Sequence, residues 1–360
     1  MTETSKVIQT LLSLLQFPSE TGNEAAIMQY VQKECDSLTV LEKIRIGNSL
    51  IYFGPCEREK PTLILYGHLD TVTNQQEKEP CIEGDKIYGC GASDMKGGLA
   101  VMLEIMKELK AVEAPPFNLG FVFYDKEEGP YEENGLGPVL NEVSRLRDCD
   151  LAIILEPTQN HIQMGCLGSL HAQVTYRGKS AHSARPWEGD NALHQGGELL
   201  TRLASLAPKE VDFEGLKFFE VINATVAKAG TTRNSIPGKF ELNLNYRFAP
   251  GKTIEQAKKE LYELVEQRAE VVFTDECPSG PTVLDNPVLT QFQNSYNLTI
   301  EAKQAWTDIA RLGIYHIPAI NFGPGESSQA HQKNEWISST TLLENYRILH
   351  SFLLGCPPHV

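Results

Sequence analysis

The chain has 360 residues, of which 41% are hydrophobic and 22% are charged, and both fractions are ordinary for a soluble globular protein. They exclude an intrinsically disordered or fibrous chain, and the length is enough for about two domains. The 47 acidic residues outnumber the 32 basic ones and give a net charge of −15, which disfavours nucleic acid and anionic membranes as partners.

The chain shows no apolar run near the roughly 18 residues of a membrane-spanning helix and no secretory signal, so we expect a cytoplasmic protein. Its eight cysteines form no C-x-x-C pair and no zinc-ribbon spacing. A large cytoplasmic chain keeps its thiols reduced, so we expect free, mostly buried cysteines without a catalytic role.

Helix-like and strand-like patterns alternate in the first third of the chain. Helices are expected at residues 4–16, 23–37 and 96–109. Strands are expected at residues 39–46, 49–54, 62–66, 119–124 and 151–155. Strands that alternate with helices predict an α/β fold with a largely parallel sheet.

The middle of the chain follows a different order, with expected elements at residues 168–177, 190–206, 218–228, 239–248, 253–268 and 270–274. They are strand, helix, strand, strand, helix and strand, which is the βαββαβ order of a ferredoxin-like domain. A strand at 317–322 and a helix at 338–354 then return to the α/β style. Joints rich in Pro flank the middle segment, so we expect a second domain of residues 167–277 inserted into a first domain of residues 1–166 and 278–360.

Side chains that can bind a metal ion follow several of the expected strands or begin the next helix. These residues are His68, Asp94, Glu127, Glu128, Glu156 and His331. Open α/β sheets bind ligands beyond the carboxyl ends of their strands. Each residue alone is more often structural, but their joint occurrence favours a site, and imidazole and carboxylate groups are donors that zinc takes.

Spacing separates the roles within this set. Neighbouring residues of an extended chain point to opposite sides, so Glu127 and Glu128 are not expected to be equivalent ligands. One of them can bind metal while the other reaches the water. Asp70 lies two residues after His68, faces the same way and can hold its imidazole.

Together with further motifs, these residues resemble the di-zinc aminoacylase/carboxypeptidase family of metallohydrolases, over nearly the whole chain. The further motifs are Gly178-Lys-Ser-Ala-His-Ser-Ala-Arg, Asn234-Ser-Ile-Pro, Asn245-Tyr-Arg-Phe-Ala-Pro and Trp306-Thr-Asp-Ile-Ala-Arg. The resemblance implies an α/β, di-zinc exopeptidase-like catalytic domain of residues 1–166 and 278–360. It implies that the inserted ferredoxin-like domain of residues 167–277 serves as lid and dimerisation domain of a homodimer.

The resemblance implies two zinc ions per subunit, for which cobalt or manganese can substitute. One zinc would be bound by His68, Asp94 and Glu156. The other would be bound by Asp94, Glu128 and His331, so that Asp94 bridges the two ions and is followed by a cis peptide bond. A Glu at position 156, where an Asp is the alternative, resembles the deacylase and carboxypeptidase members more than the aminopeptidases.

The resemblance also gives roles to residues that bind no metal. Glu127 would accept a proton as water attacks the amide carbonyl and would then pass it to the leaving amine. Asp70 would orient His68. His182 would donate to the tetrahedral oxyanion and would reach it from the partner subunit.

A substrate that carries several carboxylates requires cationic partners. Arg247 is the best candidate for a bidentate carboxylate clamp, with Asn234 donating beside it. Arg185, Thr307 and Arg311 are further candidates. The chain departs from the commoner proteobacterial pattern at Arg185 and around Thr307, which fits the actinobacterial members and leaves the acyl and amine specificity open.

We expect a small-molecule N-acyl amino-acid substrate, and the resemblance favours N-succinyl-diaminopimelate, an intermediate of lysine and cell-wall precursor synthesis. Alternatives within the family are a deacylase for acetyl-ornithine or acetyl-citrulline and a zinc carboxypeptidase. An alternative from another class is a non-catalytic binding protein that keeps the fold. The presence of Glu127 beside the complete ligand set disfavours the binding protein.

Overall fold

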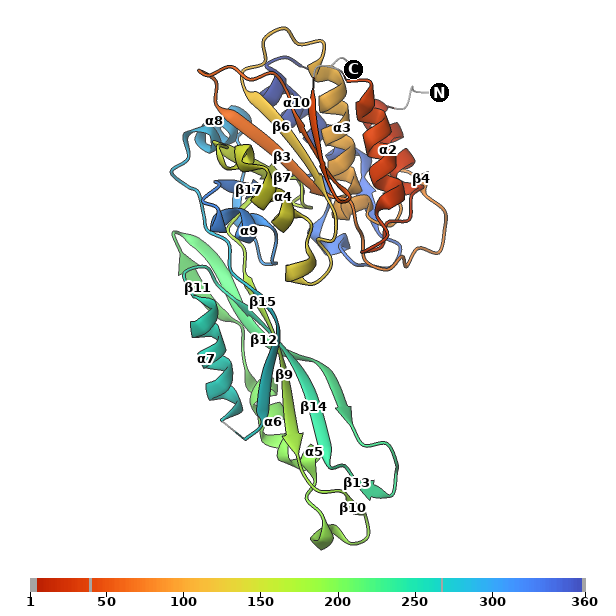
Figure 1. Ribbon diagram of the computed structural model, residues 1–360, viewed down its shortest axis with the longest axis vertical. Helices are drawn as coiled ribbons and strands as arrows, with labels where there is room; N and C mark the ends of the chain where they lie inside the picture. Colours follow the sequence, from red (N-terminus) through yellow and green to blue (C-terminus); the bar gives the residue numbers. More distant parts are fainter. Residues whose placement is uncertain (1–4, 39–40, 267, 358–360) are drawn as a thin grey trace. The chain divides into compact units, whose positions relative to one another are not determined.

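The protein is described by a computed structural model that covers residues 5–38, 41–266 and 268–357 (Figure 1). The described residues divide into two compact units. Unit 1 is made from Met1–Met164, Thr282–Glu301 and Arg311–Val360, and unit 2 from Gly165–Pro281 and Ala302–Ala310. The domain boundaries at 167 and 277 stay a prediction, because compactness alone does not define independently folding domains.

Unit 1 contains an eight-stranded sheet. In sheet order the strands are β1 (Glu42–Ile46), β2 (Ser49–Phe53), β6 (Asn118–Tyr124), β3 (Thr62–His68), β7 (Leu151–Ile154), β17 (Ala319–Asn321), β8 (Ile162–Met164) and β16 (Ile300–Ala302). The pairs β6–β3, β3–β7 and β7–β17 are parallel, whereas β1–β2, β2–β6 and β17–β8 are antiparallel. The sequence predicted a largely parallel sheet, and parallel pairing is found among the four strands β6, β3, β7 and β17.

The helices of unit 1 pack on both faces of this sheet. They are α1 (Lys6–Leu15), α2 (Ala25–Asp36), α3 (Gly97–Leu109), α4 (Leu136–Glu142), α8 (Pro287–Tyr296), α10 (Ser339–Leu354) and α9 (Ile309–Ile314), whose first residues fall in unit 2. Figure 1 shows α2 and α3 on one side of the sheet and α4 and α9 on the other. Sequence analysis missed a small sheet of β4 (Cys81–Glu83), β5 (Lys86–Tyr88) and β18 (Trp336–Ser338), because each strand has only three residues.

Unit 2 contains a five-stranded antiparallel sheet with the order β11 (Lys209–Phe213), β12 (Leu216–Ala229), β14 (Lys239–Phe248), β9 (Gly168–Arg177) and β15 (Glu270–Cys277). Its helices are α5 (Ala192–Gln195), α6 (Gly197–Ser205) and α7 (Ile254–Val265). The βαββαβ order is confirmed, with β11 as an edge strand that sequence analysis missed. The helix expected at 190–206 is interrupted at Gly196, where a Cβ atom would lie 2.4 Å from the Phe240 ring.

The two faces of the unit 2 sheet differ in polarity. Along β14 every second side chain is buried, and the buried set packs with α6 and α7 into an apolar core. The opposite side chains of β9 and β14 are polar and form what we call the open face, which comprises Ser169, His171, Gln173, Asn243, Asn245 and Arg247. Unit 2 also carries a short ribbon of β10 (Ala181–His182) and β13 (Ser235–Ile236).

Several further expectations can be compared with the structure. All eight cysteines are free thiols as expected, but only Cys35, Cys149, Cys166 and Cys277 are buried. Among the described residues, no helix has the length and apolar character needed to cross a membrane. Residue 4 of the first expected helix, residues 39–40 of the first expected strand and residue 267 lie outside the described part of the chain.

Candidate metal centre

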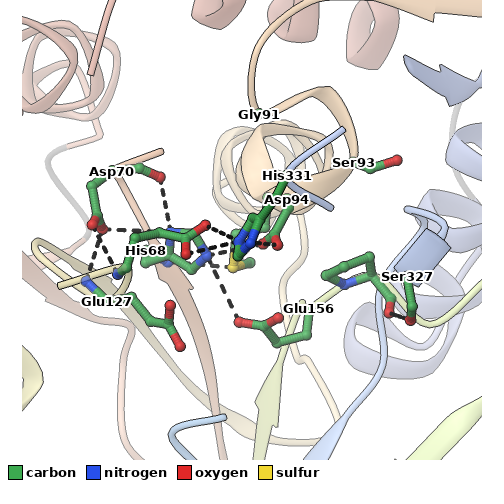
Figure 2. Close-up of polar contacts among 12 residues, drawn as sticks. His68, Asp70, Gly91, Ser93, Asp94, Glu127, Glu156, Ser327 and His331 are labelled. Carbon is green, nitrogen blue, oxygen red and sulfur yellow. Dashed lines mark hydrogen bonds and ion pairs between the residues drawn. The ribbon is translucent and has the colours of Figure 1, made fainter. Parts of the chain in front are cut away.

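The predicted ligands of unit 1 meet at one edge of its sheet (Figure 2). His68 is the last residue of β3, and the turn that follows β6 carries Glu128. Glu156 lies two residues beyond β7. Because β3 runs parallel to both β6 and β7, the three strand ends place these side chains together.

Asp94 lies between two histidines. Its Oδ1 atom is 3.2 Å from Nε2 of His68, and its Oδ2 atom is 3.8 Å from Nε2 of His331. Nε2 of His68 is also 3.8 Å from Oε1 of Glu156, while Nε2 of His331 is 3.0 and 2.9 Å from the two oxygens of Glu128. The structure therefore brings all five predicted ligands together, with one carboxylate oxygen of Asp94 facing each half of the set.

One group of three donor atoms is especially compact. Ligand atoms of His68, Asp94 and Glu128 lie within 4.8 Å of one another. Imidazole nitrogen and carboxylate oxygen are suitable donors for zinc, and the separation leaves space for a cation between them. The peptide bond after Asp94 is cis, as the family resemblance implied.

Asp70 fixes the tautomer of His68. Nδ1 of His68 lies 3.0 Å from the main-chain oxygen of Asp70 and 3.5 Å from its Oδ1 atom. Both oxygens can only accept, so Nδ1 carries a proton, and loss of the Nε2 proton would leave the Nε2 lone pair directed toward Asp94. A histidine that binds a metal commonly has such a partner on its other nitrogen.

Glu127 and Glu128 lie in a turn that follows Lys126, whose φ is +59°. The expectation that they continue an extended strand is therefore wrong. Their main-chain N–H groups both donate to the Asp70 carboxylate, at 2.9 and 3.0 Å, and Thr21 Oγ1 donates to it at 2.9 Å. The two side chains still diverge, because Glu128 contacts His331 while Figure 2 shows Glu127 directed to the space beneath His68.

Charge and burial shift the proton affinities of this cluster. Burial alone would lower the pKa of His68, but hydrogen bonds to Asp70 and Asp94 and the charge of Glu127 raise it well above its usual value. The hydrogen bond with Glu128 raises the pKa of His331 to about 9. Without cations, the carboxylates therefore retain protons on both histidines, and a bound cation would have to displace them.

Glu335 holds the loop that carries Asp94 and was missed by sequence analysis. Its carboxylate is buried and accepts from the main-chain N–H groups of Gly91, Ser93 and Asp94 at 2.7, 2.8 and 2.9 Å. Burial, together with the charge of Asp94, raises the pKa of Glu335 to about 7 despite these donors. No motif or spacing marks a residue that acts through backbone groups more than 240 positions away.

The ribbon of unit 2 brings three of the predicted residues together. His182 pairs with Ser235, and the main-chain oxygen of Asn234 accepts from the N–H of Ser183 at 3.0 Å. His182, Arg185 and Asn234 are exposed. Nδ1 of His182 accepts from the N–H of Ala184 at 3.1 Å, which leaves Nε2 as the protonated, donating nitrogen of the neutral ring.

Within one chain Arg247 does not lie beside Asn234, and their joint contact with substrate stays a prediction. Asn234 adjoins the start of β14, whereas Arg247 is next to the last residue of that strand. Eight residues of extended chain span about 26 Å. The sequence did not reveal this separation, because the two motifs are only 13 positions apart.

The remaining two candidates are buried in local contacts. The main-chain oxygen of Thr307 accepts from Cys166 Sγ at 3.5 Å within unit 2. Arg311, in unit 1, donates from Nη2 to the main-chain oxygen of Tyr131 at 2.6 Å, and its guanidinium lies 3.9 Å from the centre of the Tyr131 ring. Their predicted contact with substrate stays a prediction.

Comparison with known proteins places this geometry in context. The model of Peptidase family M20/M25/M40 matches residues 64–355. A succinyl-diaminopimelate desuccinylase of Corynebacterium glutamicum is 32% identical to the chain, over 94% of both lengths. Two solved structures each cover 97% of both chains: a tripeptidase of Staphylococcus aureus, with TM-score 0.80 and 22% identity, and a dinuclear metal-binding peptidase of Bacillus subtilis, with TM-score 0.71 and 13% identity. The fold class predicted from sequence is confirmed.

Proposed function

The chain belongs to Peptidase family M20/M25/M40, as its motifs indicated, and from this premise we propose that it hydrolyses N-succinyl-diaminopimelate. The substrate is that of the Corynebacterium glutamicum relative, which aligns over nearly the whole of both chains. The reaction breaks the amide C–N bond and adds the oxygen of water to the succinyl carbon. One proton goes to the leaving amine, so the products are succinate and diaminopimelate.

The observation that carries this proposal is the Asp94 carboxylate, whose two oxygens face His68 and His331. We propose that His68, Asp94 and Glu156 would hold one zinc ion, and that Asp94, Glu128 and His331 would hold a second. The donor set fits zinc in type and number, and the Nδ1 tautomer leaves Nε2 of His68 available. Zinc ions held there supply Lewis acidity, which polarises an amide carbonyl and acidifies water. Cobalt or manganese would accept the same donors.

Glu127 is the proposed general base. Its backbone is fixed by the N–H donated to Asp70, while Figure 2 shows its carboxylate directed to the space that Glu156 also faces. A carboxylate that binds no metal can accept the proton of the attacking water. It can then return that proton to the amine nitrogen as the C–N bond breaks.

Arg247 is the proposed clamp for a substrate carboxylate. It is half-buried, and its Nε donates to Asn245 Oδ1 at 3.0 Å. Within the described residues, neither Nη group of Arg247 contacts a protein acceptor. The terminal edge of the guanidinium can thus donate two parallel hydrogen bonds to a carboxylate.

We propose a homodimer in which two copies complete each site. The ribbon that carries His182 and Asn234 precedes the start of β14, and from that start to Arg247 the strand spans about 26 Å, so one small substrate reaches both ends only if they come from different copies. Residues 221–229 of β12 pair with β14 on one side, and no described strand pairs on the other. Such an exposed strand edge is typical of a surface that another chain covers. From the partner subunit, the protonated Nε2 of His182 would donate to the oxyanion.

The proposal is tested with a substrate panel and a metal assay. The panel contains N-succinyl-diaminopimelate, acetyl-ornithine, acetyl-citrulline and short dipeptides, each with zinc present. We expect the highest kcat/KM for N-succinyl-diaminopimelate and about two zinc ions per chain. A preference for another substrate would identify a different deacylase or a carboxypeptidase, and a folded chain that binds no metal would identify a binding protein. The cytoplasmic location stays a prediction.

A further inference from the structure

A row of polar side chains crosses the open face of unit 2 and ends at Arg247. Asn245 Oδ1 accepts from Nε of Arg247 at 3.0 Å, and Asn245 Nδ2 lies 2.9 Å from Nε2 of His171. The other ring nitrogen, Nδ1, lies 3.2 Å from the Asn243 amide, which is itself 2.6 Å from Thr225 Oγ1. His171 is therefore held at both nitrogens.

Two irregularities of the sheet aim threonines at this row. The register between β12 and β14 shifts between Ala224 and Val226, and the residue at the shift is Thr225. The register between β15 and β9 shifts between Phe273 and Asp275, and the residue at that shift, Thr274, donates to the main-chain oxygen of His171 at 3.3 Å. A β-bulge re-aims a side chain and is common next to functional sites.

The donors and acceptors of these side chains determine which group donates each hydrogen bond in the row. Arg247 can only donate, so Asn245 must present its oxygen to Arg247 and its nitrogen to His171. Nε2 of His171 is then an acceptor, and the proton of the neutral ring lies on Nδ1. The Asn243 atom at these positions is Nδ2, which lies 3.2 Å from Nδ1 of His171 and 2.6 Å from Thr225 Oγ1. A donating Nδ1 therefore requires the Asn243 amide to be turned, so that its oxygen accepts from Nδ1 and from the hydroxyl of Thr225. Only this arrangement gives both ring nitrogens of His171 a partner of the right kind.

We propose that His171 is a positioning residue, which acts through Asn245 to hold the terminal edge of Arg247 toward a substrate carboxylate. The inference rests on the role proposed for Arg247. A guanidinium on a long side chain has many rotamers, and an anchor at Nε removes much of that freedom before substrate arrives. The neutral ring suits this task because it accepts from Asn245 without adding a second positive charge beside the guanidinium.

Paired variants separate hydrogen bonding from packing. His171→Phe keeps a ring of similar size and removes both nitrogens, whereas His171→Gln retains one acceptor and one donor. We expect His171→Phe to raise KM for N-succinyl-diaminopimelate about threefold to tenfold, the effect of one lost hydrogen bond, with little change in kcat or zinc content. His171→Gln should restore KM, and Gln173→Ala on the same strand should leave it unchanged. Equal KM for the Phe variant and the wild type, or a failure of Gln to rescue, would overturn the proposal.

A second measurement does not depend on the substrate. Imidazole 15N chemical shifts distinguish the protonated nitrogen from the one with a lone pair, and we expect His171 in the Nδ1–H form. Asn245→Ala should remove that preference, whereas Gln173→Ala should preserve it. An Nε2–H ring in the wild type would contradict the proposed hydrogen bond from Asn245 to His171, even if the enzyme hydrolyses the expected substrate. If the ring is in the Nδ1–H form but the protein hydrolyses no substrate of the panel, the hydrogen bonds of His171 would stand and only the proposed function would be refuted.

Discussion

The two groups of candidate site residues are held in different ways. In unit 1, His68, Asp70 and Glu335 are each at most 3% exposed and bonded to backbone groups, which for Asp70 and Glu335 come from distant segments. In unit 2, His182 and Asn234 are exposed on a ribbon of two-residue strands. A cluster of like charges needs fixed donors to stay together, whereas groups that meet a substrate can stay solvated until it binds.

This contrast predicts how substitutions in each region act. Changes in unit 1 should alter metal binding or the proton transfer at the metal centre. Changes in unit 2 should leave the metal content unchanged and alter substrate affinity or oxyanion stabilisation. The substitutions below run from the largest expected effect to the smallest, a prediction on pH follows them, and each result could contradict this division between the units.

Replacing Glu127 by Gln should give the largest effect. The amide keeps the size of the side chain but cannot accept a proton, so kcat should fall by about 10² to 10⁴ while both metals stay bound. Glu128→Gln is the matched control, since the same change at the next residue removes a proposed ligand and should lower zinc content. Zinc analysis and steady-state kinetics on both variants decide between the two assignments. Loss of zinc from the Glu127 variant would make Glu127 a ligand.

Replacing His182 by Ala should lower kcat by about 10² to 10³ with zinc content unchanged, as for a lost oxyanion donor. Mixing this variant with the Glu127→Gln variant tests its origin. In a heterodimer, one of the two sites regains both functional residues, so activity should return after subunit exchange. Confirmed exchange without recovered activity would place His182 in the site of its own chain or outside the mechanism. His194→Ala, another exposed histidine of unit 2, should retain full activity.

Much of the fold could be predicted from sequence, because long periodic segments carry their own signal. The strands of the ferredoxin-like order and the central strands of unit 1 lie close to their expected positions. Short or interrupted elements could not be predicted. The helix break at Gly196 depends on the Phe240 ring, which lies 44 positions away, and the edge strand β11 has little alternation of its own.

The metal centre was accessible from sequence for a related reason. His68 ends one continuous apolar strand and Glu156 follows another. Parallel strands of this kind can be recognised in the sequence, and their carboxyl ends lie at the same edge of the sheet. Glu335 has no such marker, because its partners are backbone N–H groups. Nor did the motifs that hold Asn234 and Arg247 show that a whole strand separates them, since a motif gives no direction in space.

Replacing Glu335 by Gln should weaken zinc binding without touching a ligand. Both carboxylate oxygens accept from backbone N–H groups, so the NH₂ of a glutamine would face at least one donor. We expect zinc affinity to fall about 10- to 100-fold, the usual cost of losing a partner that orients a ligand. Glu77→Gln, which alters a surface carboxylate paired with Lys333, should leave zinc affinity unchanged. Competition with a chelator measures both, and equal affinities would show that the Asp94 loop needs no anchor.

The last prediction concerns pH, and the sign of the effect differs between the metal-free and the zinc-loaded protein. In the metal-free protein the pKa of His331 is raised to about 9, chiefly by its hydrogen bond to Glu128, from an ordinary value of 6.5. A raised histidine pKa stabilises the fold fully below pH 6.5, and this contribution disappears as the pH rises through about 9. Zinc binding requires the unprotonated ring, so the zinc affinity should instead rise over the same interval, by about tenfold per pH unit for one displaced proton.

The gap in Tm between zinc-loaded and metal-free protein should therefore widen from pH 6.5 to pH 9. His331→Gln is the matched variant, because it keeps a polar side chain but removes the titrating ring. In that variant the Tm of the metal-free protein should lose the pH dependence that residue 331 contributes. The gap in Tm between zinc-loaded and metal-free protein should then widen less with pH. Thermal denaturation of both proteins across the interval, with and without chelator, measures the effect. A constant gap in the wild type would mean that zinc displaces no proton, and His331 would then be no ligand.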